Sequence, residues 1–233
     1  MSDARTGWRG SRLLRYAGEF AVVFLGVTLS FVAENYREAQ AERRLEGESI
    51  ERLRRDFVQD LSDFPGNLER AEAGLAAIDW LLGVRGAAAP STDSVAHYLG
   101  QFLLCSGMMA NTSEYESLKA SGGLNRIQNE EFRQQLTLNY ERYPQLAALH
   151  DLDCQKTWEI IRLVSAEVHL VPSGYETDVT VTGSAAGVIE DREFQAALVG
   201  QRFRRLGLRS LIRQRLAQLE RLSETADSFL AGG

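Results

Sequence analysis

Apolar residues follow two different patterns along this chain. Residues 20–33 form a run of fourteen uncharged and mostly apolar residues, and the run extends back to Leu13 with only Arg15 and Glu19 interrupting it. From residue 50 onward, apolar residues recur at steps of three or four, which is the period of a helix with one buried face. The first pattern predicts a segment that is apolar on all sides, and the second predicts a series of amphipathic helices.

The first pattern fits a single membrane span. The segment from Leu13 to Ala33 has 21 residues, and at about 1.5 Å per residue it reaches roughly 30 Å, the thickness of a hydrocarbon core. A cleaved signal peptide needs small residues before the cut, whereas Phe31 stands at the third position before a cut after Ala33. A buried core helix is the weaker alternative, because the segment lies at the chain end and is apolar around its circumference. We therefore predict an uncleaved transmembrane helix over residues 13–36, preceded by a tail of residues 1–12.

Arginines on the two sides of the span predict its orientation. Cytoplasmic flanks are enriched in basic residues, and acidic residues count little in this rule. Four arginines precede the span and three follow it closely: Arg5, Arg9, Arg12 and Arg15, then Arg37, Arg43 and Arg44. This narrow excess predicts a cytoplasmic tail and a large outer domain. In a bacterial inner (cytoplasmic) membrane, the outer domain would be periplasmic.

One face of the predicted span carries small residues. On a helical plot the members of this stripe are Glu19, Val23, Gly26, Ser30 and Ala33. Small residues let helices approach each other closely in lipid, so the stripe is a candidate helix-packing interface. The alternative is that glycine and serine are simply common in spans.

The two glutamates of this region lie at the edges of the span. Glu19 is one turn from Arg15, and Glu34 is close to Arg37. A carboxylate inside a bilayer is costly and is a functional candidate by default. Their edge positions favour salt-bridged or solvated acids at the interface instead.

The charged segment of residues 37–49 predicts a solvated helical stalk that continues the span. Apolar positions then keep one helical register from Ile50 to Leu82, across Pro65 and Gly66. A turn at Pro65 would have no reason to preserve that register. A kinked continuous helix is therefore favoured over two helices joined by a hairpin.

Two short helices are expected next, as a crossover between longer ones. Ser91 is the predicted N-cap of a helix that reaches Cys105. Ser113 and Glu116 have capping-box spacing for a second helix, which Gly122 terminates.

Two long amphipathic helices complete the expected fold. Asn129 caps a helix predicted to reach Val171, and a last helix runs from about residue 191 to Leu230. Residues 171–191 alternate like a strand and are interpreted as a long loop with a small hairpin. We predict an all-α protein in which the transmembrane helix continues into a long amphipathic helix, with an antiparallel helical bundle over residues 50–233.

Two blocks of the sequence form a distinctive combination. An apolar segment opens with Gly18-Glu19 and exits at Asn35, and a Tyr-x-x-Leu-Lys-x-Ser-Gly block follows later in the chain. The residues of that block are Tyr115, Leu118, Lys119, Ser121 and Gly122. Over roughly residues 1–140 this combination resembles an uncharacterised bacterial family of single-span membrane proteins. The resemblance implies a basic cytoplasmic tail and a helical outer domain, and it implies no activity. The exit departs from the family's Asn-Asn-Trp-Asn-Glu pattern, since residues 34–38 read Glu-Asn-Tyr-Arg-Glu.

Composition narrows the classes of function. The net charge of −6 and the pI near 5.3 argue against a nucleic-acid binder, which usually presents a basic surface. The two cysteines, Cys105 and Cys154, lack the C-x-x-C spacing of thiolate zinc sites and redox pairs. They either form one disulfide or stay unpaired. Pairing needs an oxidising compartment and α-carbons within about 7 Å of each other.

Catalytic signals are absent from the sequence. His150 and Cys154 lie one helical turn apart, and Asp151 or Asp153 could join them as metal ligands. Two ligands on one helix do not make a site, so a core histidine and a core or disulfide cysteine are favoured. There is no G-x-S-x-G motif and no phosphate-binding glycine loop. We expect no enzyme and no cofactor.

The six arginines of residues 202–215 form the one notable basic patch. They could meet anionic headgroups or an acidic partner, but a solvated helix face paired with neighbouring glutamates is favoured.

These observations favour a membrane-anchored structural or accessory protein. Its expected partners are the lipid bilayer and either another membrane protein or further copies of itself. One alternative is a sensor-like bundle that binds a small ligand between its helices. A second alternative is an oligomeric membrane conduit lined by Glu19 and Ser30.

Overall fold

The computed structural model of this protein describes residues 7–84, 90–105, 107–173 and 176–232. Within these ranges, the side chains of residues 7–17, 171–173 and 176–178 are not described. The described residues are overwhelmingly helical and contain one two-stranded sheet. The predicted all-α fold is confirmed.

The chain divides into two compact units, Met1–Glu48 and Ser49–Gly233. Helix α1 (Gly7–Gly83) contributes to both. The predicted bundle domain starts at residue 50, one residue after this division. Helix α1 begins inside the predicted tail, whose residues 1–6 lie outside the described residues.

The first unit contains an apolar part of α1. Among the described residues, α1 is the one helix long and apolar enough to cross a membrane, by length and composition. Its apolar window spans 18 residues, none of them buried within the protein.

Helix α1 continues through Pro65 without a break. The ring of Pro65 is exposed, while Phe64 and Asn67 on either side of it are buried. A proline lacks the amide hydrogen of one helical bond, and an exposed position lets the helix tolerate that loss. The continuous helix predicted from the unbroken register is confirmed.

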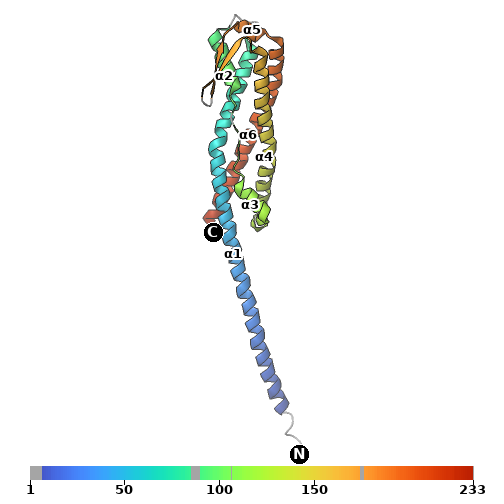
Figure 1. Cartoon of the computed structure of the whole chain (residues 1–233). Coiled ribbons are helices and arrows are strands. Elements are labelled where there is room, and N and C mark those ends of the chain that lie inside the picture. The colour runs from blue at the N-terminus through green and yellow to red at the C-terminus, as the bar shows by residue number, and fades with distance from the viewer. Residues whose placement is uncertain (1–6, 85–89, 106, 174–175, 233) are drawn as a thin grey trace, which may run out of the picture. The chain divides into compact units, whose positions relative to one another are not determined.

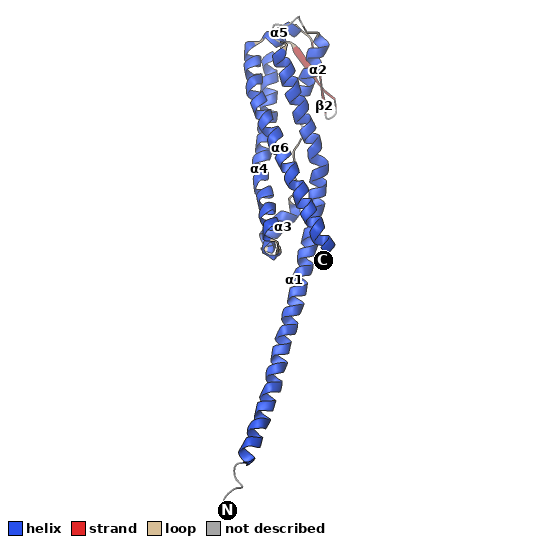
Figure 2. Ribbon diagram, turned by 180° about the vertical axis from the view of Figure 1, so that it is seen from behind, coloured by secondary structure: helices blue, strands red, loops and turns tan. Residues whose placement is uncertain are grey.

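The second unit contains the remaining elements (Figures 1 and 2). In chain order they are α2 (Thr92–Leu103), α3 (Ser113–Ser121), the 3₁₀ turn η1 (Gly123–Arg126), α4 (Glu130–Ile161), the 3₁₀ turn η2 (Arg162–Val164), β1 (Val168–Ser173), β2 (Glu176–Val181), α5 (Ala185–Glu190) and α6 (Arg192–Gly232).

Three hydrophobic clusters follow one another along the bundle, and each combines residues of α1, α4 and α6. One cluster includes Ile78, Ile160 and Leu198; the next includes Phe64, Leu146 and Ile212; the third includes Phe57, Leu136 and Leu219. Residue numbers fall from the first cluster to the third in α1 and α4, and rise in α6. Helices α1 and α4 therefore run parallel, and α6 is antiparallel to both. The segment carrying α2 and α3 is the crossover that returns the chain from the first cluster to the third.

The predicted caps at the starts of α2 and α4 are present. Ser91 Oγ accepts the amide of Ser94 at 3.1 Å, and Asn129 Oδ1 accepts the amide of Phe132 at 3.0 Å. The capping box predicted at Ser113 is wrong, because the N-cap of α3 is Thr112 and its side chain makes no capping bond.

Helix α4 is shorter than predicted. It ends at Ile161 instead of Val171, and β1 and β2 then form an antiparallel hairpin in which Val168 faces Val181. Val168 is buried against the first hydrophobic cluster. Val168 and Leu170, two alternate residues of β1, thus pack against the core in a strand that pairs with β2.

Helix α5 was not foreseen. Its N-cap is Ser184, whose Oγ accepts the amide of Gly187 at 3.2 Å. Its buried residues Val188 and Ile189 belong to the first hydrophobic cluster.

Candidate functional site

The predicted stripe of small residues lies on an exposed part of α1. Glu19, Val23, Gly26, Ser30 and Ala33 are all exposed. A Cβ added at Gly26 would meet nothing within 4 Å. Ser30 Oγ donates to the Gly26 carbonyl at 2.9 Å, so the hydroxyl needs no partner outside its own helix. This face is available to lipid or to another helix.

At the edge of the same segment, Glu34 and Arg37 form an exposed ion pair at 3.4 Å. An exposed pair one turn apart contributes little stability. The place of Glu34 at the edge of a span stays a prediction.

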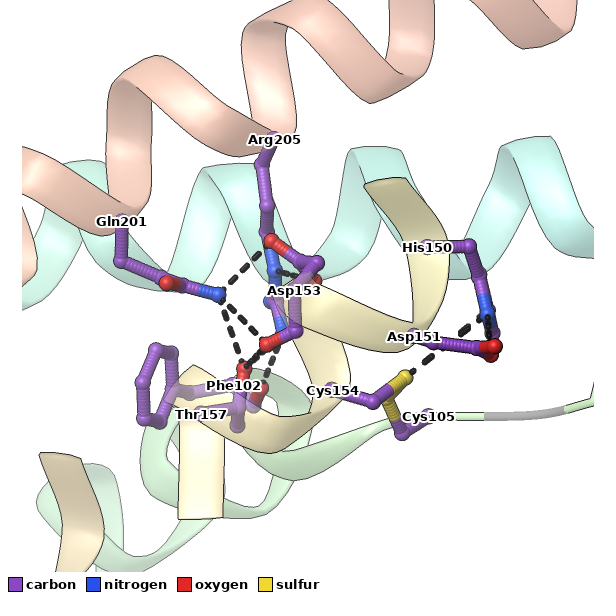
Figure 3. The surroundings of a disulfide bond; sticks show 9 residues. All are labelled: Phe102, Cys105, His150, Asp151, Asp153, Cys154, Thr157, Gln201 and Arg205. Carbon is purple, nitrogen blue, oxygen red and sulfur yellow. Dashed lines mark hydrogen bonds and ion pairs between the residues drawn. A yellow bond between two sulfur atoms is a disulfide. The ribbon is translucent and has the colours of Figure 1, made fainter. Parts of the chain in front are cut away.

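Cys105 and Cys154 are joined in a disulfide (Figure 3). Their α-carbons lie 5.8 Å apart, within the range that a disulfide requires. Cys105 follows α2 and Cys154 lies in α4, so the bond links the crossover to a long helix. The sequence left open whether these cysteines pair, because it could not place the crossover beside α4.

A histidine lies beside this disulfide. Cys154 Sγ is 3.9 Å from His150 Nδ1 and 3.8 Å from His150 Nε2. Asp151 Oδ1 is 3.6 Å from Nδ1 of the same ring. His150 is buried and Asp151 is exposed. One ligand atom each of Cys105, His150 and Cys154 lies within 4.8 Å of the others. The structure thus adds Cys105 to the pair found in the sequence.

Asp153, the other acid considered for that pair, lies in a buried polar network instead (Figure 3). Arg205 is 1% exposed and its Nε donates to Asp153 Oδ2 at 3.1 Å. Its Nη2 donates to the Phe102 carbonyl at 2.6 Å and to Thr157 Oγ1 at 3.1 Å. Gln201 Nε2 donates to Asp153 Oδ1 at 2.7 Å. Residues of α2, α4 and α6 therefore converge on one guanidinium and one carboxylate.

Helix α1 makes room for this guanidinium at Gly74. A Cβ at that position would lie 1.7 Å from Arg205 Nη1. Burial lowers the pKa of Arg205 and raises the pKa of Asp153, because desolvation penalises both charged forms. Breaking such a pair would leave an uncompensated charge in the core.

A second buried arginine occupies the middle of the bundle. Arg215 Nη2 donates to Asp60 Oδ2 at 3.2 Å, and Nη1 donates to the Asn139 carbonyl at 2.8 Å. Asp60 Oδ1 also accepts the backbone amide of Asn111 at 2.9 Å. The guanidinium carbon lies 4.8 Å from the centre of the Tyr143 ring. Asp60 of α1 thus bonds both to the crossover residue Asn111 and to Arg215 of α6.

The predicted solvated basic face of α6 is therefore only partly right. Arg202 forms a surface ion pair with Asp79 at 2.5 Å. Arg205 and Arg215, by contrast, are core residues. From Leu198 onward, the buried positions of α6 alternate at steps of three and four: Leu198, Gln201, Arg205, Leu208, Ile212, Arg215, Leu219, Leu222 and Ala226. This spacing was the sequence signal that Arg205 and Arg215 are buried, despite the charge of their side chains.

A pocket of about 370 Å³ lies between α4 and α6. It is lined by Asn139, Arg142, Tyr143, Gln145, Leu146, Leu211, Gln214, Arg215 and Gln218. The lining mixes polar and apolar side chains and includes two arginines. Of the two, Arg215 is already bonded to Asp60, whereas Arg142 is exposed.

The Tyr-x-x-Leu-Lys-x-Ser-Gly block has a structural place in α3. Tyr115 stacks on Tyr140 of α4 with ring centres 4.5 Å apart, and Leu118 is buried in the same cluster. Lys119 Nζ lies 5.7 Å from the centre of the Tyr115 ring. Gly122 ends the helix at a φ of 70°, a conformation that glycine adopts without strain. Packing and helix termination thus account for most of this block.

Comparison with known proteins adds no relative. No family model, no curated protein and no solved structure matches this chain. The resemblance to the uncharacterised membrane-protein family stays an expectation that rests on the two sequence blocks.

Proposed function

We propose that this protein is a membrane-anchored helical accessory protein that contacts another membrane protein, or a second copy of itself, through its span. The observation that carries this proposal is the exposed apolar window of α1. Burial of apolar surface is worth roughly 25 cal/mol per Å². Side chains such as Phe24 and Phe31, which are 60% and 67% exposed, therefore require lipid or protein around them.

Two independent features support a bacterial inner-membrane location with the bundle in the periplasm. The arginine excess before the span favours a cytoplasmic N-terminus. The disulfide favours an oxidising compartment for the bundle, because cytosolic reductants keep most thiols reduced. Both features concern the same topology and neither depends on the other.

Thiol trapping in intact cells at native expression tests this topology. Acid quenching followed by alkylation should find Cys105 and Cys154 oxidised, and they should become labelled only after chemical reduction. Alkylation of both cysteines before any reduction would contradict a periplasmic bundle. Both cysteines are half-buried, so the labelling is carried out after denaturation.

The stripe of small residues supports a helix partner within the membrane. Gly26 offers a flat surface on which a partner backbone can approach. The polar side chain of Ser30 is satisfied within α1. Neither residue would therefore expose an unpaired polar group to lipid.

Gentle detergent extraction followed by native mass measurement tests the association. The wild-type protein should appear as an oligomer or with a co-purifying partner, and Gly26→Leu should shift it towards the monomer. Thr28→Leu is the matched control, because residue 28 lies about 200° around the helix from residue 26. A wild-type monomer without any partner would refute the proposal.

A second candidate function rests on the pocket between α4 and α6. The exposed guanidinium of Arg142 suits a small anionic ligand, as in a sensor-like bundle. A thermal-shift screen of carboxylates and phosphate esters tests it. Stabilisation that Arg142→Ala abolishes would favour this candidate, and the absence of any stabilisation would count against it.

A further inference from the structure

We propose that Cys105, His150 and Cys154 form a binding site for a zinc-like divalent ion when their disulfide is reduced. The protein would then carry one cross-link between the crossover and α4 in either redox state. That link would be a disulfide under oxidising conditions and a metal ion under reducing conditions. This inference does not depend on the proposed membrane partner.

The three ligand types suit such an ion. Thiolates and imidazole select zinc and related metals, whereas magnesium and calcium prefer oxygen ligands. Three protein ligands with one position left for water are a common arrangement for zinc. The sulfurs qualify only after reduction, because the thiolate is the form that binds metal.

The spacing of the ligand atoms fits a tetrahedral site. Zinc–sulfur and zinc–nitrogen bonds of about 2.3 and 2.0 Å place ligand atoms roughly 3.5–3.8 Å apart. Cys154 Sγ and His150 Nε2 already lie 3.8 Å apart. They project from successive turns of α4, where residues four apart share one face. Reduction would let the sulfur of Cys105 move away from that of Cys154 into the third position.

A carboxylate lies near one nitrogen of the histidine. Asp151 Oδ1 lies 3.6 Å from His150 Nδ1. In the proposed site a small side-chain movement would let Nδ1 donate to this carboxylate and leave Nε2 for the metal. Carboxylate partners of this kind are common behind metal-bound histidines. Asp153 is not a candidate ligand, because its two oxygens accept bonds from Gln201 and Arg205.

The redox step needs a two-electron reductant such as a dithiol. The dithiol transfers two electrons and two protons to the Cys105–Cys154 disulfide and becomes a disulfide itself, while the protein gains two thiols. Binding of one divalent ion then displaces the two thiol protons. Both cysteine residues are half-buried and not fully enclosed.

The test uses the full chain in detergent and Co²⁺ as a spectroscopic probe for Zn²⁺. The protein is reduced with a phosphine, which is removed under anaerobic conditions before Co²⁺ is added. We expect one equivalent of Co²⁺ with thiolate-to-metal charge-transfer absorption, and Zn²⁺ should displace it. The oxidised protein should show no such absorption.

Variants separate this site from incidental binding. Cys105→Ser should lose most of the charge-transfer absorption. Asp151→Asn, at an exposed position, should weaken Co²⁺ binding by about 10–100-fold, while Asp63→Asn on an exposed part of α1 should leave it unchanged. Circular dichroism confirms that each reduced protein is folded. Absence of the absorption in folded, reduced wild-type protein would overturn the proposal. So would equal binding by the Cys105→Ser/Cys154→Ser double variant.

Discussion

At the scale of single residues, the bundle depends on a glycine that faces an arginine. Arg205 can reach Asp153 and the Phe102 carbonyl only because α1 has no Cβ at position 74. Its Nη1 has no hydrogen-bond partner among the described residues. That nitrogen lies against the glycine backbone, where a side chain would otherwise stand.

Gly74→Ala should therefore destabilise the bundle. The added methyl group would displace the guanidinium and break a buried ion pair, at a cost of about 3–5 kcal/mol. Denaturant unfolding followed by circular dichroism measures this loss. Gly207→Ala is the matched control, because its Cβ would meet only Leu149 Cδ2 at 4.0 Å. That variant should be neutral, or more stable by up to about 1 kcal/mol. Equal effects of the two substitutions would contradict this account.

Asp56 should make stability depend on pH. Desolvation raises the pKa of Asp56 above its ordinary 3.8, and its Oδ2 has no hydrogen-bond partner among the described residues. A raised folded pKa means that the folded state binds the proton more tightly, so this contribution to stability is present at low pH. It is lost as pH rises from 3.8 through the raised value.

The comparison of wild type with Asp56→Asn isolates this effect. The free energy of unfolding of wild type, relative to the variant, should rise as pH falls through that window. Asp63→Asn, at an exposed position of the same helix, should show no comparable change relative to wild type. A constant difference between wild type and Asp56→Asn across the window would refute the assignment.

Sequence reasoning identified some of these residues but not their environment. The pairing of His150 with Cys154 followed from a separation of four on a helix. Cys105 could not be added, because its approach depends on the path of the crossover. Arg205 and Arg215 were assigned to the surface on their charge, although their spacing matched the core positions of α6. An arginine can be buried when an acidic side chain in the core pairs with it. The partners here, Asp153 and Asp60, are distant from Arg205 and Arg215 in sequence, so the sequence alone did not reveal the pairs.

At the scale of elements, α1 is the helix whose continuity was hardest to predict. Its apolar register across Pro65 was the correct guide, and the turn-like composition around Pro65 and Gly66 was misleading. The register reflects packing against α4 and α6. The stability from that packing offsets the hydrogen bond that the exposed proline cannot make.

Pro65→Ala should therefore stabilise the protein. Alanine restores a helical hydrogen bond and is favoured over proline by up to about 3 kcal/mol in a helix interior. Thermal and denaturant unfolding measure the gain. Ser62→Ala, at an exposed position one turn earlier, gives the scale of an ordinary surface change. A destabilised Pro65→Ala protein would indicate that the proline has a role outside helix continuity.

The end of α4 shows where local pattern is insufficient. Residues 168–171 continue an apolar pattern that a helix would accept, and only their pairing with β2 makes them a strand. That partner follows after a short connection and was itself recognised as strand-like. The sequence therefore predicted that a hairpin follows α4. It did not predict the residue at which β1 begins, because that boundary depends on the pairing of β1 with β2.

Reduction of the disulfide should lower the stability of the bundle. The cross-link spans a sequence separation of 49 residues, for which the loss of chain entropy in the unfolded state corresponds to about 4 kcal/mol. Unfolding should be compared with and without a phosphine reductant, in the presence of a chelator that keeps metal away. Unchanged stability in the Cys105→Ser/Cys154→Ser variant would contradict this expectation.

At the scale of the whole molecule, the chain combines an exposed apolar helix with a bundle that has its own core. Leu25 lies within the exposed apolar segment. Leu25→Arg should reduce membrane integration, because arginine at the centre of a span costs about 2.5–3.5 kcal/mol on insertion scales. Carbonate extraction of membranes measures the integrated fraction, and Leu25→Phe is the apolar control. Equal membrane fractions for the two variants would argue that this segment does not span the bilayer.

The disulfide also determines how the protein would respond to a mechanical load. If the span is held in a membrane and the C-terminus is pulled, tension passes from Cys105 directly to Cys154 through the covalent bond. The 49 residues of separation between them would be shielded from extension, which at about 3.3–3.6 Å per residue is roughly 160–180 Å of contour length. A dithiol reductant would release that hidden length, so the redox state of one bond sets how far this chain can be stretched.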